Sequence, residues 1–264
     1  MSKYKVQETK RNQTLLIVEG NHEKNELFWL VFKCFPEVNI DLNNVLIYGT
    51  NIYMLYEDIV KMYGDDWVEE EIDVDLPFVI SKKKTPDNVR YKSDFTKILL
   101  VFDYERHDTN FSERKITQMQ RKFSDVTDMG QLYINYPMME SFRYCNTFDD
   151  DQYLSATIPI AMLGKFKSLA SQMKLSGIAV TEYKKEDFIK LMQMNIKRLK
   201  NLSEDCPNIL SYQTYQSISV AQEIAAKQYD IVQDKQELWV LNTCLFLILD
   251  YFGNKNGFYD SIIS

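Results

Sequence analysis

Two apolar runs that end in acidic residues constrain the fold of this chain more than any other feature. Residues 14–20 read TLLIVEG, and residues 97–105 read KILLVFDYE. Runs of Leu, Ile and Val without polar alternation are typical of strands buried on both faces, as in parallel sheets covered by helices. Shorter strands are expected at residues 44–50 and 131–136. The sequence therefore predicts an α/β fold built on a parallel sheet.

Segments with a period near 3.6 separate these strands. Helices are expected at residues 22–35, 52–63 and 112–123. Pro36 follows the first of them and favours its end, and Ser112 stands at the N-cap position of the third. Because strands and helices alternate, the connections should be right-handed crossovers that place helices against the sheet.

The pattern changes near residue 147. With 264 residues, the chain is long enough for one large domain, or for one domain with an appendage. We expect an α/β domain over residues 1–146, interrupted by a charged insertion at about 64–96, and a mostly helical region over 147–264. The acidic run 69–75 and the basic run 82–84 are expected to be solvated faces. Helices are expected in the C-terminal region at residues 187–202, 215–231 and 235–252.

Composition excludes several classes of protein. The net charge of −7 argues against free-standing electrostatic binding of nucleic acid, but not against an enzyme that reaches phosphates through bound cations or a partner. The four cysteines are far apart, so reduced thiols in a cytoplasmic protein are expected. The apolar run 238–252 is too short for a membrane span. Without a Walker A motif, the chain should not hydrolyse ATP by itself.

Carboxylates follow the expected strands at the point where each one ends. Glu19 follows the first strand, Asp103 and Glu105 follow the third, and Glu140 opens a helix after the fourth. Ligands of open parallel sheets bind at the carboxyl ends of the strands, so these acids should share one edge. Glu23 lies one helical turn beyond Glu19 and is a further candidate.

Acids gathered in this way repel one another unless a cation neutralises them. Mg²⁺ and Mn²⁺ prefer oxygen ligands, and either would polarise a phosphodiester and help to activate water. We therefore expect one or two such ions at Glu19, Glu23, Asp103, Glu105 and Glu140. All of these except Glu23 are expected to be catalytic.

The order of these motifs resembles the TOPRIM domain of topoisomerases, primases and OLD-family nucleases. IVEG at residues 17–20 resembles the first motif of that family, and VFDYE at 101–105 resembles its DxD motif with Glu105 as the second acid. NYPMMES at 135–141 and YGTNIYMLY at 48–56 resemble segments of stand-alone TOPRIM-like proteins of bacterial abortive-infection systems. The resemblance covers residues 14 to 146.

The resemblance implies a metal-dependent nuclease that acts as the effector of an anti-phage system. Such effectors are often controlled by an ABC-type or SMC-like ATPase partner. The C-terminal helices would then dock that partner or form a homo-oligomer. Whether the substrate is DNA or RNA stays open, as does the number of metal ions.

Three further residues near the acids are candidates for contacts with substrate. His107 and Arg106 follow the DxE motif, and Ser141 follows Glu140. An imidazole, a guanidinium and a hydroxyl at a helix terminus can each contact phosphate. For His107, an exposed loop histidine without a role is the simpler interpretation.

Two other hypotheses remain. The chain can be a non-catalytic subunit that keeps the TOPRIM scaffold and binds a trigger or partner; Glu105 in place of Asp favours this, whereas Glu19, Asp103 and Glu140 argue against it. A fragment of a primase or topoisomerase is the weakest hypothesis, because no template-binding module or nucleophilic tyrosine domain is evident in the sequence.

Overall fold

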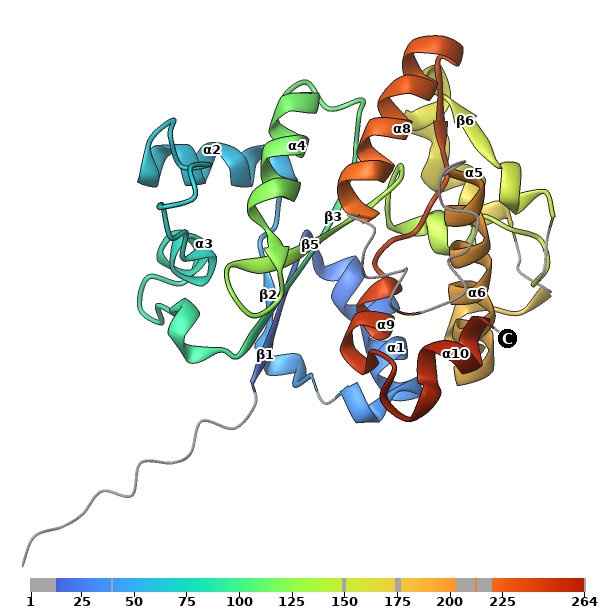
Figure 1. The fold of residues 1–264 in the computed structure, drawn as a ribbon, viewed down its shortest axis with the longest axis horizontal. Helices are drawn as coiled ribbons and strands as arrows, with labels where there is room; N and C mark the ends of the chain where they lie inside the picture. Colours follow the sequence, from blue (N-terminus) through green and yellow to red (C-terminus); the bar gives the residue numbers. More distant parts are fainter. Residues whose placement is uncertain are drawn as a thin grey trace, which may run out of the picture.

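A five-stranded sheet forms the centre of the molecule (Figure 1). The computed structural model describes residues 13–38, 40–148, 151–173, 177–202, 212 and 220–263. The strand order is β2-β1-β3-β5-β4. Four strands are parallel and the short β4 pairs antiparallel with β5 at one edge. The strands are β1 (Thr14–Val18), β2 (Val45–Ile47), β3 (Lys97–Asp103), β4 (Ser124–Asp125) and β5 (Gly130–Asn135). The predicted α/β fold with a mostly parallel sheet is confirmed.

The two apolar runs form the central strands of this sheet. Every residue of β1 is buried, and every residue of β3 except Lys97 is buried. Their Leu, Ile and Val side chains face helices on both sides, which is why neither run alternates with polar residues. In Figure 1, α2 (Ile52–Tyr63), α3 (Leu76–Lys84) and α4 (Glu113–Lys122) lie on one side of the sheet. On the other side lie α1 (Trp29–Cys34) and α9 (Phe246–Phe252).

Helix α2 shows how the sequence specifies a local element. Its bounds are those predicted, 52–63. The Asn51 side chain caps the helix by accepting a hydrogen bond from the Met54 N–H at 3.1 Å. Gly64 ends it with φ of 85°, a conformation that favours glycine. The charged insertion contributes α3, and its Glu69–Glu71 and Lys82–Lys84 side chains are exposed, as expected for solvated faces.

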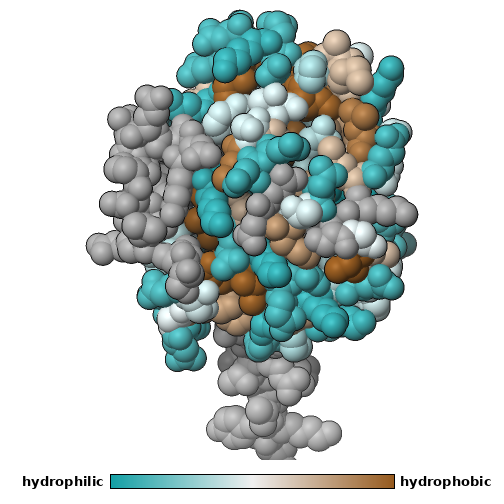
Figure 2. Space-filling model, turned by 90° about the vertical axis from the view of Figure 1, so that its right-hand side faces the viewer, coloured by the Kyte–Doolittle hydropathy of each residue, from teal (hydrophilic) through white to brown (hydrophobic). Residues whose placement is uncertain are grey.

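The C-terminal region is mainly helical. Its α-helices, in the part of the chain that the structure describes, are α5 (Phe166–Gln172), α6 (Lys185–Leu202), α8 (Val220–Lys235), α9 and α10 (Phe258–Ile263). The helix expected at 215–231 corresponds to α8, although residues 215–219 lie outside the described residues. A two-stranded antiparallel sheet of β6 (Thr157–Pro159) and β7 (Glu237–Trp239) accompanies these helices. On the side of the molecule seen in Figure 2, apolar residues appear as separate patches among hydrophilic ones.

The single helix predicted over residues 235–252 is wrong. Helix α8 ends at Lys235, β7 follows, and α9 begins only at Phe246. Residues 240–249 of this segment are all buried, so its apolar residues carry no period that separates a strand from a helix. Pairing with β6 supplies backbone partners for β7 and decides the outcome. This pairing joins residues that are distant in sequence, which a local pattern does not encode.

Shorter helical turns connect the main elements. A π-helix at Glu23–Phe28 leads into α1. In the described residues, 3-10 helices form further turns at Pro36–Val38, Leu42–Asn44, Lys92–Asp94, Met139–Arg143, Tyr153–Ser155, Ile160–Lys165, Val180–Glu182 and Lys255–Gly257. Across the ranges given above, no helix is both long and apolar enough to cross a bilayer.

The C-terminal region packs directly against the sheet. Tyr136 and Leu241 exchange two backbone hydrogen bonds of 2.8 and 2.9 Å, so residue 241 lies beside the chain that leaves β5. Thr243 extends this contact by donating to the Ile134 carbonyl at 2.7 Å. Residues 241–243 therefore act as an added neighbour at the carboxyl end of β5.

Candidate functional site

The strand register brings the predicted acids to one edge of the sheet. Val18 lies opposite both Ile47 and Val101, and Asp103 lies opposite Asn135, so the strands end at nearly the same level. Five acids surround this carboxyl edge, and we call them the acid rim: Glu19, Glu23, Asp103, Glu105 and Glu140.

Glu19 and Asp103 are joined across β1 and β3. The Asp103 backbone N–H donates to Glu19 Oε2 at 3.3 Å, so the Glu19 side chain turns toward the neighbouring strand. Glu23 turns back instead, and its Oε2 accepts a hydrogen bond of 2.8 Å from the Gly20 N–H. A Cβ at Gly20 would lie 3.2 Å from that same oxygen, which explains why a glycine suits this position.

Asp103 is held from behind by two buried amides. Asn135 Nδ2 donates to Asp103 Oδ1 at 3.3 Å, and Asn242 Nδ2 donates to Asn135 Oδ1 at 3.1 Å. Both asparagines are fully buried. Asn242 also receives a 3.2 Å hydrogen bond from the Leu245 N–H, so the start of α9 fixes its orientation. The C-terminal region thus orients the central acid of the rim through Asn135.

Glu105 has an unusual backbone. Its φ is 34°, in the left-handed region that residues other than glycine rarely adopt. The Glu105 N–H donates to the Pro137 carbonyl at 3.2 Å, which holds the turn in place. Strained backbone of this kind persists where surrounding structure demands it, and it is concentrated at functional sites.

Glu140 lies in the 3-10 helix after β5 and is buried, with 2% of its surface exposed. Its Oε1 lies 3.1 Å from Lys167 Nζ and 3.7 Å from His22 Nε2. Among the described residues, that buried oxygen forms no hydrogen bond, although the Lys167 ammonium lies within ion-pair distance of it. Its hydrogen-bonding capacity is therefore unused.

Burial and mutual repulsion raise the pKa values of three acids of the rim, Glu19, Asp103 and Glu105. Burial, followed by the charge of Glu105, raises the pKa of Glu19 from 4.5 to about 8, against the opposing hydrogen bond from Asp103. Burial raises the pKa of Asp103 well above its ordinary range, and the charges of Glu19, Glu23 and Glu140 raise it further. The pKa of Glu105 is also raised, first by burial. When ionised, these acids would carry more negative charge than their surroundings compensate, so the folded protein keeps protons on them to higher pH.

The donor chemistry of the rim fits a hard divalent cation, whereas the present side-chain arrangement does not form its coordination shell. Oxygen-only ligands and unneutralised charge are what Mg²⁺ and Mn²⁺ require. In the described part of the chain, however, no three acidic, histidine or cysteine side chains converge on a common point. The reason is visible in the hydrogen bonds: Glu19, Glu23 and Asp103 each accept from a separate donor. A cation would have to draw them inward.

The three expected substrate contacts differ in placement. His107 is exposed and close enough to Glu105 to lower that carboxyl's pKa. Arg106 turns away from the rim, since its Nη1 pairs with Glu113 at 2.7 Å and its guanidinium lies over Phe111. Ser141 is fully buried, donating to the Leu241 carbonyl at 3.4 Å. It supports the 241–243 segment and has no surface from which to contact a substrate, contrary to expectation.

Two residues that support the rim were not among the residues expected from the sequence. Asn242 falls within the segment expected to be helical, and Lys167 lies in α5, far from any acidic motif in sequence. Asn in the middle of an otherwise apolar run was the one available signal for Asn242, because a buried amide needs a partner.

No family model, curated protein or solved structure matches this chain. Function must therefore be inferred from the residues and their geometry.

Proposed function

We propose that this chain is a metal-dependent nuclease of the TOPRIM type, with Mg²⁺ or Mn²⁺ as its cofactor. One observation carries the proposal: five carboxylates from three segments of the chain lie along one sheet edge, where burial and repulsion raise the pKa values of Glu19, Asp103 and Glu105. Such a cluster is costly without a cation, and perturbed acids of this kind favour a functional site.

Each acid has a role that follows from its placement. Asp103, Glu19 and Glu140 are the residues that would hold the cation, and Asn135 fixes the orientation of Asp103 for this purpose. When bound, a divalent cation neutralises charge on a phosphodiester and favours deprotonation of water. Glu105 lies beside exposed His107, so these two side chains are placed to meet the substrate at the outer part of the rim.

The biological setting is part of the same proposal. The resemblance of the motifs supports an anti-phage effector in the cytoplasm whose activity is controlled by an ABC-type or SMC-like ATPase. The contact of residues 241–243 with β5 supports control through the C-terminal region, since a partner bound there would act on Asp103 through Asn242 and Asn135.

Cleavage of nucleic acid tests the proposal. The protein is incubated with Mg²⁺ or Mn²⁺ and with single- and double-stranded DNA and RNA, tRNA included, alone and with any ATPase encoded beside it. We expect cleavage that Glu19→Gln and Asp103→Asn abolish, and that Glu37→Gln, at an exposed carboxyl paired with Lys185, leaves unchanged. The proposal would be refuted if the wild type cleaved nothing under any condition, or if Glu19→Gln and Asp103→Asn cleaved as well as the wild type.

One observation favours a second candidate, a non-catalytic subunit that binds a trigger or partner. In the described residues the rim does not form a metal shell. Isothermal titration calorimetry with Mn²⁺, which measures binding of the cation, separates the two candidates. The nuclease requires binding that Asp103→Asn removes, whereas the non-catalytic subunit shows no binding.

A further inference from the structure

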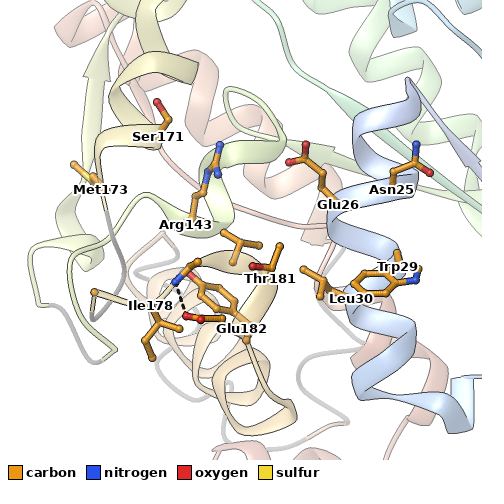
Figure 3. Close-up of a pocket in the computed structure, with 14 residues that line it drawn as sticks. Asn25, Glu26, Trp29, Leu30, Arg143, Ser171, Met173, Ile178, Thr181 and Glu182 are labelled. Carbon is orange, nitrogen blue, oxygen red and sulfur yellow. Dashed lines mark hydrogen bonds between the residues drawn. The ribbon is translucent and has the colours of Figure 1, made fainter.

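A pocket of about 580 Å³ lies beside the acid rim and has no role in the chemistry described so far. Figure 3 shows its walls, which come from the helix that carries Trp29, from the turn that carries Arg143, and from the segment around Thr181. Its lining is largely apolar, with Leu30 and Tyr183 among the contributors. A volume of this size is typical of small-ligand sites.

The pocket is joined to the rim by two short routes. Arg143 lies in the same 3-10 helix as Glu140, three residues further along. Glu26, which lines the pocket, pairs at 2.7 Å with His22 Nδ1, and the other nitrogen of that imidazole lies 3.7 Å from Glu140. A polymer whose phosphate lies at the rim would therefore place an adjacent unit in the pocket.

Three side chains of the pocket are set up for a planar polar ligand. Trp29 is 45% exposed, an unusual exposure for the largest apolar side chain. The buried Nε of Arg143 has no hydrogen-bond partner among the described residues. Figure 3 shows Arg143 and Glu26 extending into the pocket from opposite walls. The pocket thus offers a stacking surface, a donor and an acceptor.

We propose that this pocket binds one unpaired guanine base of the nucleic acid that the rim cleaves. The inference rests on the proposed nuclease function and names its substrate class. Guanine carries the acceptors O6 and N7, which suit an arginine fork, and the donors N1–H and N2–H₂, which suit a carboxylate such as Glu26. Lys33 Nζ lies 5.3 Å from the centroid of the Trp29 ring, over one face. The other face of the ring supplies the stacking surface, because unpaired bases are commonly bound on aromatic faces.

Binding without cleavage tests this assignment. Fluorescence anisotropy in EDTA measures the affinity for a short oligouridylate with one guanosine, for an oligothymidylate with one deoxyguanosine, and for the same strands without guanine. Free guanosine monophosphate serves as competitor. We expect a preference for the guanine-containing strands, and the three probes distinguish RNA, DNA and free nucleotide as the source of the base.

Variants connect the preference to the pocket. Trp29→Leu and Arg143→Gln should each weaken binding of the guanine-containing strand by about fivefold or more. Arg143→Lys should recover only part of the loss, because lysine keeps the charge but not the fork. Tyr229→Leu on α8 and Arg121→Gln on α4, at exposed positions outside the pocket, serve as matched controls and should bind as the wild type does. Unchanged thermal unfolding shows that each variant is folded.

The outcomes separate this inference from the proposed function. Equal affinity for strands with and without guanine, or wild-type binding by both pocket variants, would overturn the assignment of the pocket. Glu19→Gln should keep the guanine preference in EDTA while losing cleavage. If the wild type prefers guanine-containing strands but cleaves none of the nucleic acids, the result would count against the proposed nuclease activity and not against the pocket.

Discussion

Replacing Glu19 by glutamine should stabilise the metal-free protein at alkaline pH. The folded protein holds the Glu19 proton up to about pH 8, whereas an unfolded chain releases it near 4.5. Between these values the folded state binds more protons than the unfolded state, so the free energy of unfolding falls as the pH rises. Glutamine has nearly the same shape and does not ionise, so Glu19→Gln removes this loss.

The expected magnitude follows from the pKa itself. A difference of one pH unit corresponds to ~1.4 kcal/mol, so a pKa moved from 4.5 to about 8 corresponds to at most about 5 kcal/mol. Glu19 is partly exposed, and solvent screens some of its repulsion with Glu105. We therefore expect the free energy of unfolding of Glu19→Gln to exceed that of the wild type by about 2–5 kcal/mol near pH 9. Near pH 4 the two free energies should differ little.

Urea unfolding in EDTA across this pH range measures the effect. Glu37→Gln is the matched control, because its exposed carboxyl has a lowered pKa, first through its backbone hydrogen bond and then through Lys185. The free energy of unfolding of Glu37→Gln should show no gain over that of the wild type between neutral and alkaline pH. A constant difference between Glu19→Gln and the wild type at every pH, or a wild type more stable near pH 9, would refute the electrostatic account of the rim.

Three further predictions concern the support of the rim. Asn242→Leu should lower the free energy of unfolding by about 3 kcal/mol in urea titrations, because it leaves buried hydrogen-bonding groups without their partner. The control Asn254→Ala, at an exposed position, should stay within about 0.5 kcal/mol of the wild type. A loss as small as that for Asn242→Leu would contradict a stabilising role of these buried hydrogen bonds. Glu105→Gly should be about 1 kcal/mol more stable than Glu105→Gln, since the φ of 34° at this position suits glycine. Glu105→Gly should also lose nuclease activity. Equal stability of the two variants would show that the turn is unstrained. Mg²⁺ or Mn²⁺ should raise the melting temperature of the wild type, and Asp103→Asn should remove most of that shift; an undiminished shift would place the cation elsewhere.

The sequence predicts the sheet and much of its edge because local patterns encode them. The buried runs of β1 and β3 have no polar alternation, and the bounds of α2 follow from the Asn51 cap and Gly64. Parallel strands of similar length end together, so Glu19 and Asp103 were expected at one edge. These inferences need only composition and spacing.

Contacts between distant segments lie beyond such patterns. The pairing of β6 with β7 and the donation from Asn242 to Asn135 depend on how the C-terminal region meets the sheet. The burial of Ser141 has the same origin, because residues 241 and 242 cover it. A local pattern places a residue on an element, but it does not show which other element packs over it.

The backbone exchange between Tyr136 and Leu241 also has a consequence for the order in which the protein is made. Leu241 leaves the ribosome roughly a hundred residues after Tyr136, a delay of about 5–20 s at ordinary rates of translation. Until then the end of β5 lacks its neighbour, and Asn135 lacks the amide that orients it. A nascent chain can therefore assemble the sheet early, but it completes the setting of Asp103 only in its final stage of synthesis.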